Sequence, residues 1–410
     1  MAMDLMLRNA RLPTGQTADI GIEDGCIAAI GEGLSSAKQE IDLEQRFTQP
    51  AFVNPHLHAC KSFWSWELAH QPAKVQALHR FEALGQIKRS YMPESVYKRG
   101  KRLIELAIQN GTWAIRLFAD VDEQAGLRAL EGLKRLQAEF PFMTIQLIPF
   151  PQNGFARFPE NMELLEQAVA QGCDAVGAVP WLEPSQADGE AHAEFCLGLA
   201  KKYNLPLHAV ADDTEDPNSA TGAYLAALAV KHRWPLLLTQ LGSLGFQDDA
   251  TARKTIGLIK EAGATVISNA HIELVTCQTT RQPIPRGNTR VKELLAAGVR
   301  VVTAQDDVDN PYYPFGRNDP LDVALWTAHV AQLAWGEELE TVRHMVTDWS
   351  AQALGLEGYG LEVGSKANLV VLDAQNWREA LQFQVAKRYV ILGGRIRAEE
   401  KREARLYVER

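Results

Sequence analysis

The middle of the chain, about residues 49 to 355, alternates short apolar runs with longer stretches of helical periodicity. Stretches such as "NMELLEQAVAQGC" and "ATARKTIGLIKEAG" repeat apolar residues at helical spacing and include a glycine near the end, which predicts helices. The runs between them are almost continuously apolar, as strands buried on both faces of a parallel sheet require. Eight such runs are present: 51–58, 113–121, 144–151, 175–181, 205–211, 235–241, 265–271 and 300–307.

Eight strand and helix units over about 300 residues favour an α/β fold, a (β/α)8 barrel of the TIM type, over an open doubly wound sheet. No GxGxxG motif follows the first strand, which argues against a dinucleotide-binding fold. The barrel is therefore predicted to be one domain of residues 49–356.

Both ends of the chain show a different sequence pattern, which predicts short strands joined by turns. Asp24-Gly25 and Gly393-Gly394 are hairpin signals between alternating apolar positions. Neither end is large enough to bury a core alone. We therefore predict that residues 1–48 and 357–410 pair into one small β-sandwich domain.

Composition and charge exclude several classes of partner. The chain has 410 residues, of which 46% are hydrophobic and 23% charged, as in ordinary globular proteins. A net charge of −9 without a Lys/Arg block argues against nucleic acid, and no apolar run approaches the length that spans a membrane. Five scattered cysteines without a CxxC pair, and no signal-peptide pattern, favour a cytoplasmic location. A small-molecule partner is expected, and a homo-oligomer is left open.

Polar side chains stand at the ends of several predicted strands, where barrels place their functional groups. In His56-Leu57-His58 the two histidines are two positions apart, so both imidazoles point to the same side of the strand. His208 and Asp306 end two other strands and would complete a shell of three histidines and one carboxylate. This nitrogen and oxygen set suits one divalent ion, Zn²⁺ or Fe²⁺, better than magnesium or calcium.

A structural explanation exists for several of these residues. A histidine near a strand end can be a hydrogen-bonded rim residue, which is an alternative for His208. Asp306 and Asp307 could cap the helix that follows them. His271, at the end of the seventh run, stays open between the rim and the pocket.

Longer motifs resemble the amidohydrolase superfamily, and within it the cytosine deaminase-like branch, which includes N-substituted ammelide amidohydrolases. The resemblance covers nearly the whole chain. It rests on these segments: "PAFVNPHLH", "IQLIPFPQNG", "GCDAVGAVPWLEP", "PRGNTRVKELLAAGVRVVTAQDDVDNPYYPFGRND" and "GYGLEVGSKANLVVLDA".

The resemblance implies His56, His58, His208 and Asp306 as metal ligands and Gln152 as a substrate contact. In that branch the metal activates a water by lowering its pKa, and the water attacks an sp² carbon that bears an amino group. The carboxylate of the eighth strand, here Asp306, takes a proton from the water.

Three titratable groups of the branch pattern, one Glu and two His, are replaced in this chain. Ala211 stands where a proton-shuttling Glu is expected after the fifth strand, and Thr239-Gln240 replaces Ser-His on the sixth. Phe118 replaces a histidine of the second strand. A methyl group carries no proton and an amide does not titrate, and losing one general acid or base typically lowers the rate by about 10²- to 10⁴-fold. Classical cytosine deamination is therefore put in question.

Other residues could take over the missing proton transfers. Asp212 and Asp213 follow Ala211 directly, although acids there can equally cap a helix. His271 could stand in for the missing sixth-strand histidine, and Gln240 could still act there by hydrogen bonding.

The expected substrate contacts, besides Gln152, are Lys61, Asp307 and Trp181. Lys61 has a parallel in the ammelide-hydrolysing relatives, whose His-x-Asp-Lys-Ser-Phe corresponds to "HACKSF" here. Trp181 belongs to a set of aromatic residues in strand-following loops that could cover a flat ring or pack the rim.

The sequence thus predicts a metal-dependent amidohydrolase or deaminase that cleaves a C–N bond of a small cyclic nitrogen compound. The alternative is a catalytically silent or repurposed member that binds a small ligand without turnover.

Overall fold

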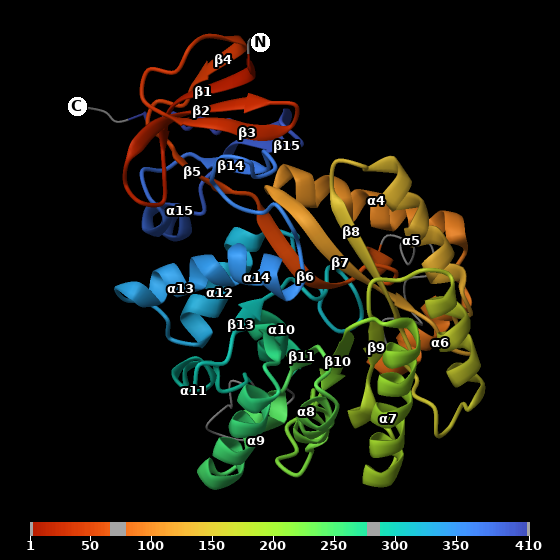
Figure 1. Cartoon of the computed structure of the whole chain (residues 1–410). Helices are drawn as coiled ribbons and strands as arrows, with labels where there is room; N and C mark the ends of the chain where they lie inside the picture. The colour runs from red at the N-terminus through yellow and green to blue at the C-terminus, as the bar shows by residue number, and fades with distance from the viewer. Residues whose placement is uncertain (1–2, 66–78, 277–287, 408–410) are drawn as a thin grey trace.

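The computed structural model describes residues 3–65, 79–276 and 288–407 of an α/β protein (Figure 1). All eight predicted strands are present, and every pairing among them is parallel. They are β6 (Phe52–His58), β7 (Thr112–Asp120), β8 (Thr144–Phe150), β9 (Val176–Ala178), β10 (Leu207–Ala211), β11 (Leu236–Gln240), β12 (Thr265–Ser268) and β13 (Val301–Thr303).

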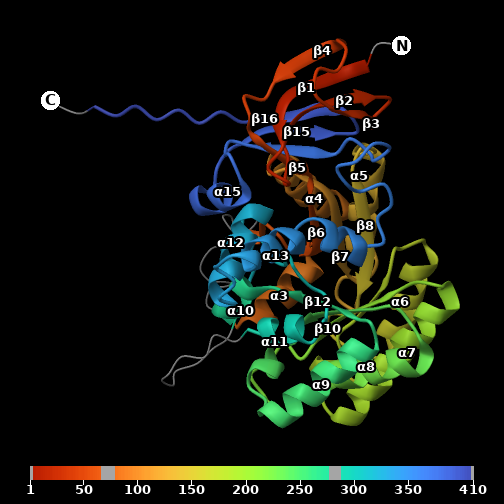
Figure 2. The same ribbon diagram turned by 60° about the vertical axis from the view of Figure 1, so that its left-hand side comes forward.

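Helices follow these strands and surround them (Figures 1 and 2). Buried aliphatic side chains of strands and helices form one large apolar core between them. The helices are α3 (Arg80–Arg89), α4 (Pro93–Gln109), α5 (Arg128–Glu139), α6 (Glu160–Ala170), α7 (Gln186–Tyr203), α8 (Thr221–His232), α9 (Asp249–Glu261), α10 (Ala270–Thr276), α11 (Val291–Ala296), α12 (Pro320–Val330), α13 (Glu337–Met345), α14 (Asp348–Ala353) and α15 (Trp377–Phe383). None of the described helices is long and apolar enough to cross a membrane.

The parallel strands fall into two hydrogen-bonded sheets, β6-β7-β8 and β9-β10-β11-β12-β13. An isolated parallel bridge between Leu57 and Asp306 joins the end of β6 to the segment after β13. The first and last predicted barrel strands therefore meet, as a barrel requires. Among the described strands no ladder joins β8 to β9, so full closure stays a prediction.

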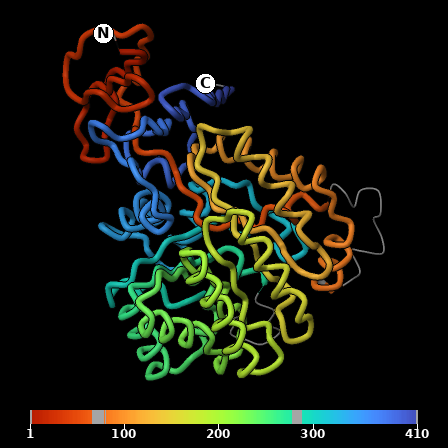
Figure 3. Tube along the Cα trace, turned by 45° about the vertical axis from the view of Figure 1, so that its right-hand side comes forward, coloured from red at the N-terminus to blue at the C-terminus, as the bar shows by residue number. Residues whose placement is uncertain are grey.

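The two chain ends meet in a separate sheet. Figure 3 shows the red N-terminal and the blue C-terminal segments lying together. The strands run in the order β16-β15-β14-β5-β1-β2-β3, with β4 paired to β1, and β14 is antiparallel to β5. This sheet has its own apolar cluster, built from both ends. The pairing of the ends agrees with the prediction, while the sandwich packing and the domain boundaries stay predictions. The strands are β1 (Met3–Arg11), β2 (Thr17–Glu23), β3 (Cys26–Gly31), β4 (Ala37–Asp42), β5 (Phe47–Pro50), β14 (Leu369–Leu372), β15 (Lys387–Leu392) and β16 (Arg395–Glu399).

A buried ion pair ties this sheet to the helical layer. The Lys387 ammonium of β15 lies 2.6 Å from Oδ2 of Asp319, which also caps α12. Both side chains are almost fully buried. Removing Lys387 leaves the buried carboxylate with the more distant and exposed guanidinium of Arg317, 3.5 Å away, and breaking a buried pair typically costs about 3–5 kcal/mol.

Lys387→Ala is therefore expected to lower the free energy of unfolding by about 3–5 kcal/mol in urea titrations. Lys401→Ala is the matched control, because Lys401 is exposed and its substitution should change stability by less than about 0.5 kcal/mol. Equal effects of the two substitutions would contradict a structural role for the buried pair.

Candidate metal centre and pocket

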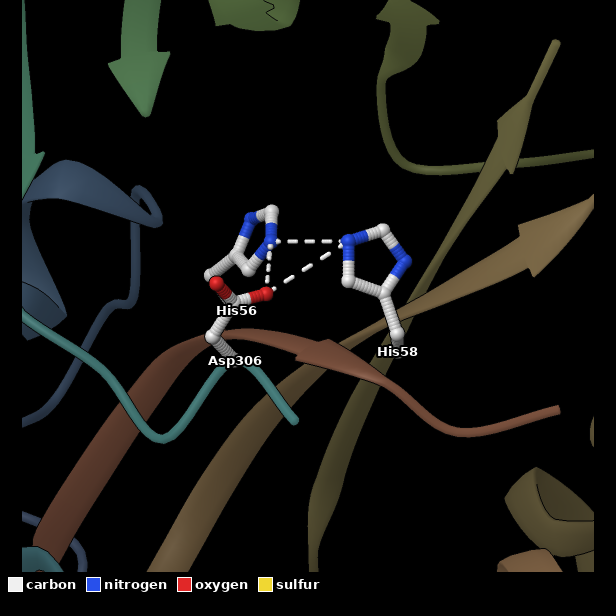
Figure 4. A group of neighbouring side chains, drawn as sticks. All are labelled: His56, His58 and Asp306. Carbon is white, nitrogen blue, oxygen red and sulfur yellow. Dashed lines mark hydrogen bonds and ion pairs between the residues drawn. The ribbon is translucent and has the colours of Figure 1, made fainter. Parts of the chain in front are cut away.

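Two predicted metal ligands lie at the carboxyl end of β6, and a third follows β13. The Nε2 atoms of His56 and His58 are 3.3 Å apart, and they lie 3.0 and 3.5 Å from Oδ1 of Asp306 (Figure 4). All three side chains are buried, and their ligand atoms lie within 4.8 Å of one another. The alternation of side chains along a strand places both imidazoles on one face, as the His-x-His spacing predicts.

The donor set and its protonation fit a divalent metal. Burial, followed by Lys61 and His56, holds the pKa of His58 well below its ordinary value. Burial alone would raise the pKa of Asp306, but His56 and Lys61 outweigh it and hold that pKa low. Neutral imidazole and ionised carboxylate are the forms that bind metal, and two nitrogens with one oxygen suit Zn²⁺ or Fe²⁺.

His208, the fourth predicted ligand, lies beside this group and not within it. Its Nε2 is 2.8 Å from Oγ1 of Thr239 and 3.4 Å from Nδ1 of His56, while its Nδ1 is 3.3 Å from a guanidinium nitrogen of Arg116. A guanidinium only donates, so this contact makes Nδ1 the acceptor and leaves Nε2 to donate to Thr239. The structure thus brings His208 to His56 with its Nε2 already hydrogen-bonded.

The Asp306 carboxylate is held by two amides from neighbouring strands. Its Oδ2 accepts hydrogen bonds from Nε2 of Gln240 at 2.6 Å and from Nδ2 of Asn269 at 3.0 Å. Both Gln240 and Asp306 have left-handed backbones, with φ of 75° and 60°. Such backbones are unfavourable for residues other than glycine and persist where their surroundings impose them. Gln240, predicted as catalytic, therefore acts here as the donor that orients Asp306.

Phe118 packs against all three histidines. Its ring centroid lies 4.2 Å from that of His56, 4.9 Å from His208 and 5.1 Å from His58. Ala211, also fully buried, is the second apolar replacement of an expected polar group. Phe118 therefore gives the three histidines an apolar neighbour that neither binds nor releases a proton.

Residues predicted to contact substrate line one cavity above the metal group, together with Asp213 and Tyr312. Nζ of Lys61 donates to Oε1 of Gln152 at 2.8 Å and lies 5.2 Å from the ring centroid of Tyr312. The Oε1 atom of Gln152 accepts this hydrogen bond. The other polar group of the Gln152 side chain is its amide nitrogen, which is a donor. The predicted residues Asp307 and Trp181 lie on the same wall.

The charges of this wall are coupled. Burial opposes the charge of Lys61, but Asp120 and Asp307 outweigh burial and raise the pKa of the ammonium. Burial and the neighbouring Asp306 raise the pKa of Asp307. Lys61 is therefore protonated and places a positive charge in the pocket.

The structure does not bring Asp212 to the cavity. Its carboxylate accepts hydrogen bonds from Ser219, from the backbone and hydroxyl of Thr221 and from the backbone of Gly222, at 2.7–2.8 Å. It therefore caps the start of α8, and the catalytic role predicted for it lacks a geometric basis. Its neighbour Asp213 is the acid that lines the cavity.

His271 is also placed away from the cavity wall. Its Nε2 lies 3.1 Å from the carbonyl oxygen of Gln305, and its ring packs edge-on against Tyr313. Burial lowers its pKa to about 4, so the ring is neutral at pH 7. In this position His271 supports the segment that carries Asp306, and the predicted catalytic role lacks a direct contact with the pocket.

Sequence reasoning missed one residue of the site, Asn269, which donates to the Asp306 carboxylate. It lies in the turn between β12 and the short helix α10, where the sequence shows no clear pattern. The only signal was the position of Asn269 directly after a predicted strand core, where barrels place functional groups.

Comparison with known proteins agrees with the motifs. The model of the amidohydrolase family matches residues 76–398, and the chain belongs to this family. Its relatives place it in the cytosine deaminase-like branch. N-isopropylammelide isopropyl amidohydrolase of Pseudomonas sp. (strain ADP) is 28% identical over 96% of both chains. Pterin deaminase of Rhizobium rhizogenes is 26% identical over 92% of this chain and 87% of its own.

Solved structures show the same fold. The 5-methylcytosine deaminase of Klebsiella pneumoniae, liganded with 5-fluorocytosine, superimposes with a TM-score of 0.91 at 29% identity, covering 98% of this chain and 99% of its own. N-isopropylammelide isopropylaminohydrolase from Burkholderia multivorans has a TM-score of 0.83 at 24% identity, over 97% and 99%. The overall fold is thus that of the TIM-barrel type.

The capping role of Asp212 is open to a direct test. Asp212→Ala is expected to lower the free energy of unfolding by about 1–2 kcal/mol, because four hydrogen bonds at the start of α8 are lost. Glu215→Ala in the same loop should change it by less than about 0.5 kcal/mol. If Asp212→Ala left the stability unchanged but abolished turnover, the result would support a catalytic role for Asp212 and contradict the capping role.

Proposed function

We propose that the protein is a metal-dependent amidohydrolase that cleaves a C–N bond of a small planar nitrogen compound. The observation that carries the proposal is the group of His56, His58 and Asp306 at the base of a cavity lined by Lys61 and Gln152. The named relatives support it, because they are amidohydrolases or deaminases of ammelide, pterin and cytosine compounds.

His56, His58 and Asp306 would hold one Zn²⁺ or Fe²⁺ ion, with His208 as the proposed fourth ligand. When bound, such an ion supplies a nucleophile at neutral pH by lowering the pKa of water. Asp306 is oriented for this task, since Gln240 and Asn269 fix one oxygen and leave the other toward the histidines.

The polar groups of the cavity define the proposed substrate. Lys61 and the amide of Gln152 are donors on one wall, and they suit a carbonyl oxygen of a ring. Asp307 and Asp213 are acids elsewhere on the wall and suit ring N–H or amino groups. Tyr312, held over Lys61, offers an aromatic face to a flat ring. A ring that carries both oxo and amino substituents fits this distribution.

A second candidate function has its own supporting observation. Gln240 and Asn269 already occupy Oδ2 of Asp306, and Ala211 and Phe118 replace groups that would carry protons. A protein with this interior could bind a planar ligand without turnover.

Three further expectations remain proposals. The cytoplasmic location, the absence of nucleic-acid and membrane partners, and homo-oligomer formation rest on the sequence alone.

Metal analysis tests the centre. Purified protein is expected to contain about one Zn²⁺ or Fe²⁺ per chain, and His58→Ala should weaken metal binding by at least about 100-fold, since losing a ligand costs more than losing its outer partners. His329→Ala is the matched control, because His329 is exposed on α12 and its imidazole bonds only the backbone of Leu325 among the described residues. Metal-free wild-type protein of normal stability would overturn the metal proposal.

A substrate panel of amino- and oxo-substituted pyrimidines, triazines and pterins tests the reaction. Wild-type protein should release ammonia or an alkylamine from at least one of them, and His58→Ala should not. Binding without release by the metal-loaded protein would favour the silent alternative.

Restoring the two missing groups tests why cytosine would be a poor substrate. The double substitution Ala211→Glu with Gln240→His should raise cytosine deamination by about 10²-fold or more. Metal content and thermal stability must match the wild type for the comparison to hold. No gain under those conditions would show that other differences, such as Phe118, limit the reaction.

A further inference from the structure

Lys88, near the end of α3, carries a buried ammonium outside the metal group. Its Nζ donates to Oδ2 of Asp122 at 2.5 Å and to Oδ1 of Asn153 at 2.9 Å. A buried ammonium is costly unless it is paired and hydrogen-bonded. This charge is therefore held in one place by partners from two different segments.

The two partners of Lys88 lie in loops that follow neighbouring strands. Asp122 follows β7 and Asn153 follows β8, and these strands are paired in parallel. Oδ1 of Asp122 accepts hydrogen bonds from the backbone N–H groups of Gln124 and Ala125 at 3.1 and 2.9 Å, so this carboxylate is fixed within its own loop. The ammonium thus ties two loops together at the carboxyl ends of the strands, where barrels place their functional groups.

Asn153 is hydrogen-bonded through both polar atoms of its amide. Its Oδ1 accepts from Lys88, and its Nδ2 donates to Oε1 of Glu123 at 2.6 Å. Asn161 of α6 donates to the other carboxylate oxygen of Glu123 and to the carbonyl oxygen of Gly154, both at 2.9 Å. The loop after β8 is therefore held by side chains from α3, from the loop after β7 and from α6.

This network reaches the cavity through Gln152, the residue directly before Asn153. The backbone N–H of Gln152 donates to the carbonyl oxygen of Phe150 at 3.0 Å, and its side chain accepts from Lys61 at 2.8 Å. Gln152 lines the cavity, whereas neither Lys88 nor Asn153 is among the described residues that line it. Lys88 would therefore act on a substrate through the groups that it positions.

We propose that Lys88 is a positioning residue that, through Asn153, holds the amide of Gln152 in place for a carbonyl oxygen of the substrate ring. A donor that is already ordered binds more tightly than a mobile one, because ordering a side chain on binding costs free energy. Lys88 therefore sets the affinity for the carbonyl-bearing part of the ring and not for the ring as a whole. The inference rests on the proposed function, in which Gln152 and Lys61 receive that oxygen.

The binding of two matched probes tests this role. Cytosine carries a ring carbonyl and an amino group, whereas 4-aminopyrimidine has the same ring skeleton and amino group without the carbonyl. In calorimetric titrations of the metal-loaded protein, Lys88→Met is expected to weaken cytosine binding by about 3- to 10-fold, the effect of one lost hydrogen bond, and to change 4-aminopyrimidine binding by less than about 2-fold. Equal weakening for both probes would overturn the proposal, because a merely structural role would lower both affinities.

A double-mutant cycle separates action through Gln152 from a general effect on the pocket. Gln152→Ala alone should weaken cytosine binding by a similar factor of about 3- to 10-fold. Adding Lys88→Met to Gln152→Ala should weaken cytosine binding no further, because residues that act through one shared contact are not additive. Fully additive losses in the double variant would contradict the proposed route.

Two further variants make the test independent of stability. Asn153→Ala removes the link to the loop after β8 but keeps the pair of Lys88 and Asp122, so it should reproduce the loss of cytosine affinity even if Lys88→Met does not fold. Lys387→Met is the matched control, because it breaks another buried ion pair, in the sheet of the chain ends, and should leave both affinities unchanged. Wild-type cytosine affinity in folded Asn153→Ala would overturn the proposal.

The outcomes also separate this inference from the function on which it rests. If wild-type protein turns over a compound of the panel and Lys88→Met binds both probes as the wild type does, the positioning role fails while the amidohydrolase proposal stands. If wild-type protein turns over another compound but does not bind cytosine, the positioning role also fails, because the ring carbonyl is the group assigned to the amide of Gln152. Metal-loaded wild-type protein that neither binds nor hydrolyses any compound of the panel would overturn both.

Discussion

The backbone pairing between the end of β6 and the segment after β13 is the constraint on which the site depends. The N–H of Asp306 donates to the carbonyl oxygen of His56 at 3.0 Å, and the N–H of His58 donates to that of Asp306 at 2.7 Å. These two hydrogen bonds hold the first predicted barrel strand, β6, beside the segment that follows the last one, β13. They also impose the left-handed backbone that turns the Asp306 carboxylate toward the histidines. The relative positions of His56, His58 and Asp306 are therefore set by strand pairing and not by a loop conformation.

The same rigidity allows apolar or non-titrating side chains beside an intact metal group. Ala211, Phe118 and Gln240 lie on strands β10, β7 and β11, and each is buried where the resemblance implies a titratable group. Apolar packing preserves the sheet, because buried polar groups without partners are costly. The amides of Gln240 and Asn269 preserve the orientation of Asp306 without titrating. Among the described residues, the acids that line the cavity are Asp213, Asp306 and Asp307.

Much of this arrangement could be predicted from the sequence, for identifiable reasons. Continuous apolar runs mark buried parallel strands, and the period of two fixes the direction of His56 and His58. The direction of His208 could not be predicted, because it depends on Arg116 and Thr239 from neighbouring strands. The capping role of Asp212 depends on a loop closing back on it. Asn269 was missed because a single amide after a strand carries no pattern.

The polarity of the cavity sets how a substrate would lie in it. Lys61 is fixed on Gln152, so two donors converge on one side and would receive the carbonyl end of a ring. Asp213 and Asp307 line the same cavity and would face the nitrogen-bearing groups of such a ring. A ring held in this way would lie over the metal group, because His58 and Asp306 line the cavity together with Lys61 and Gln152.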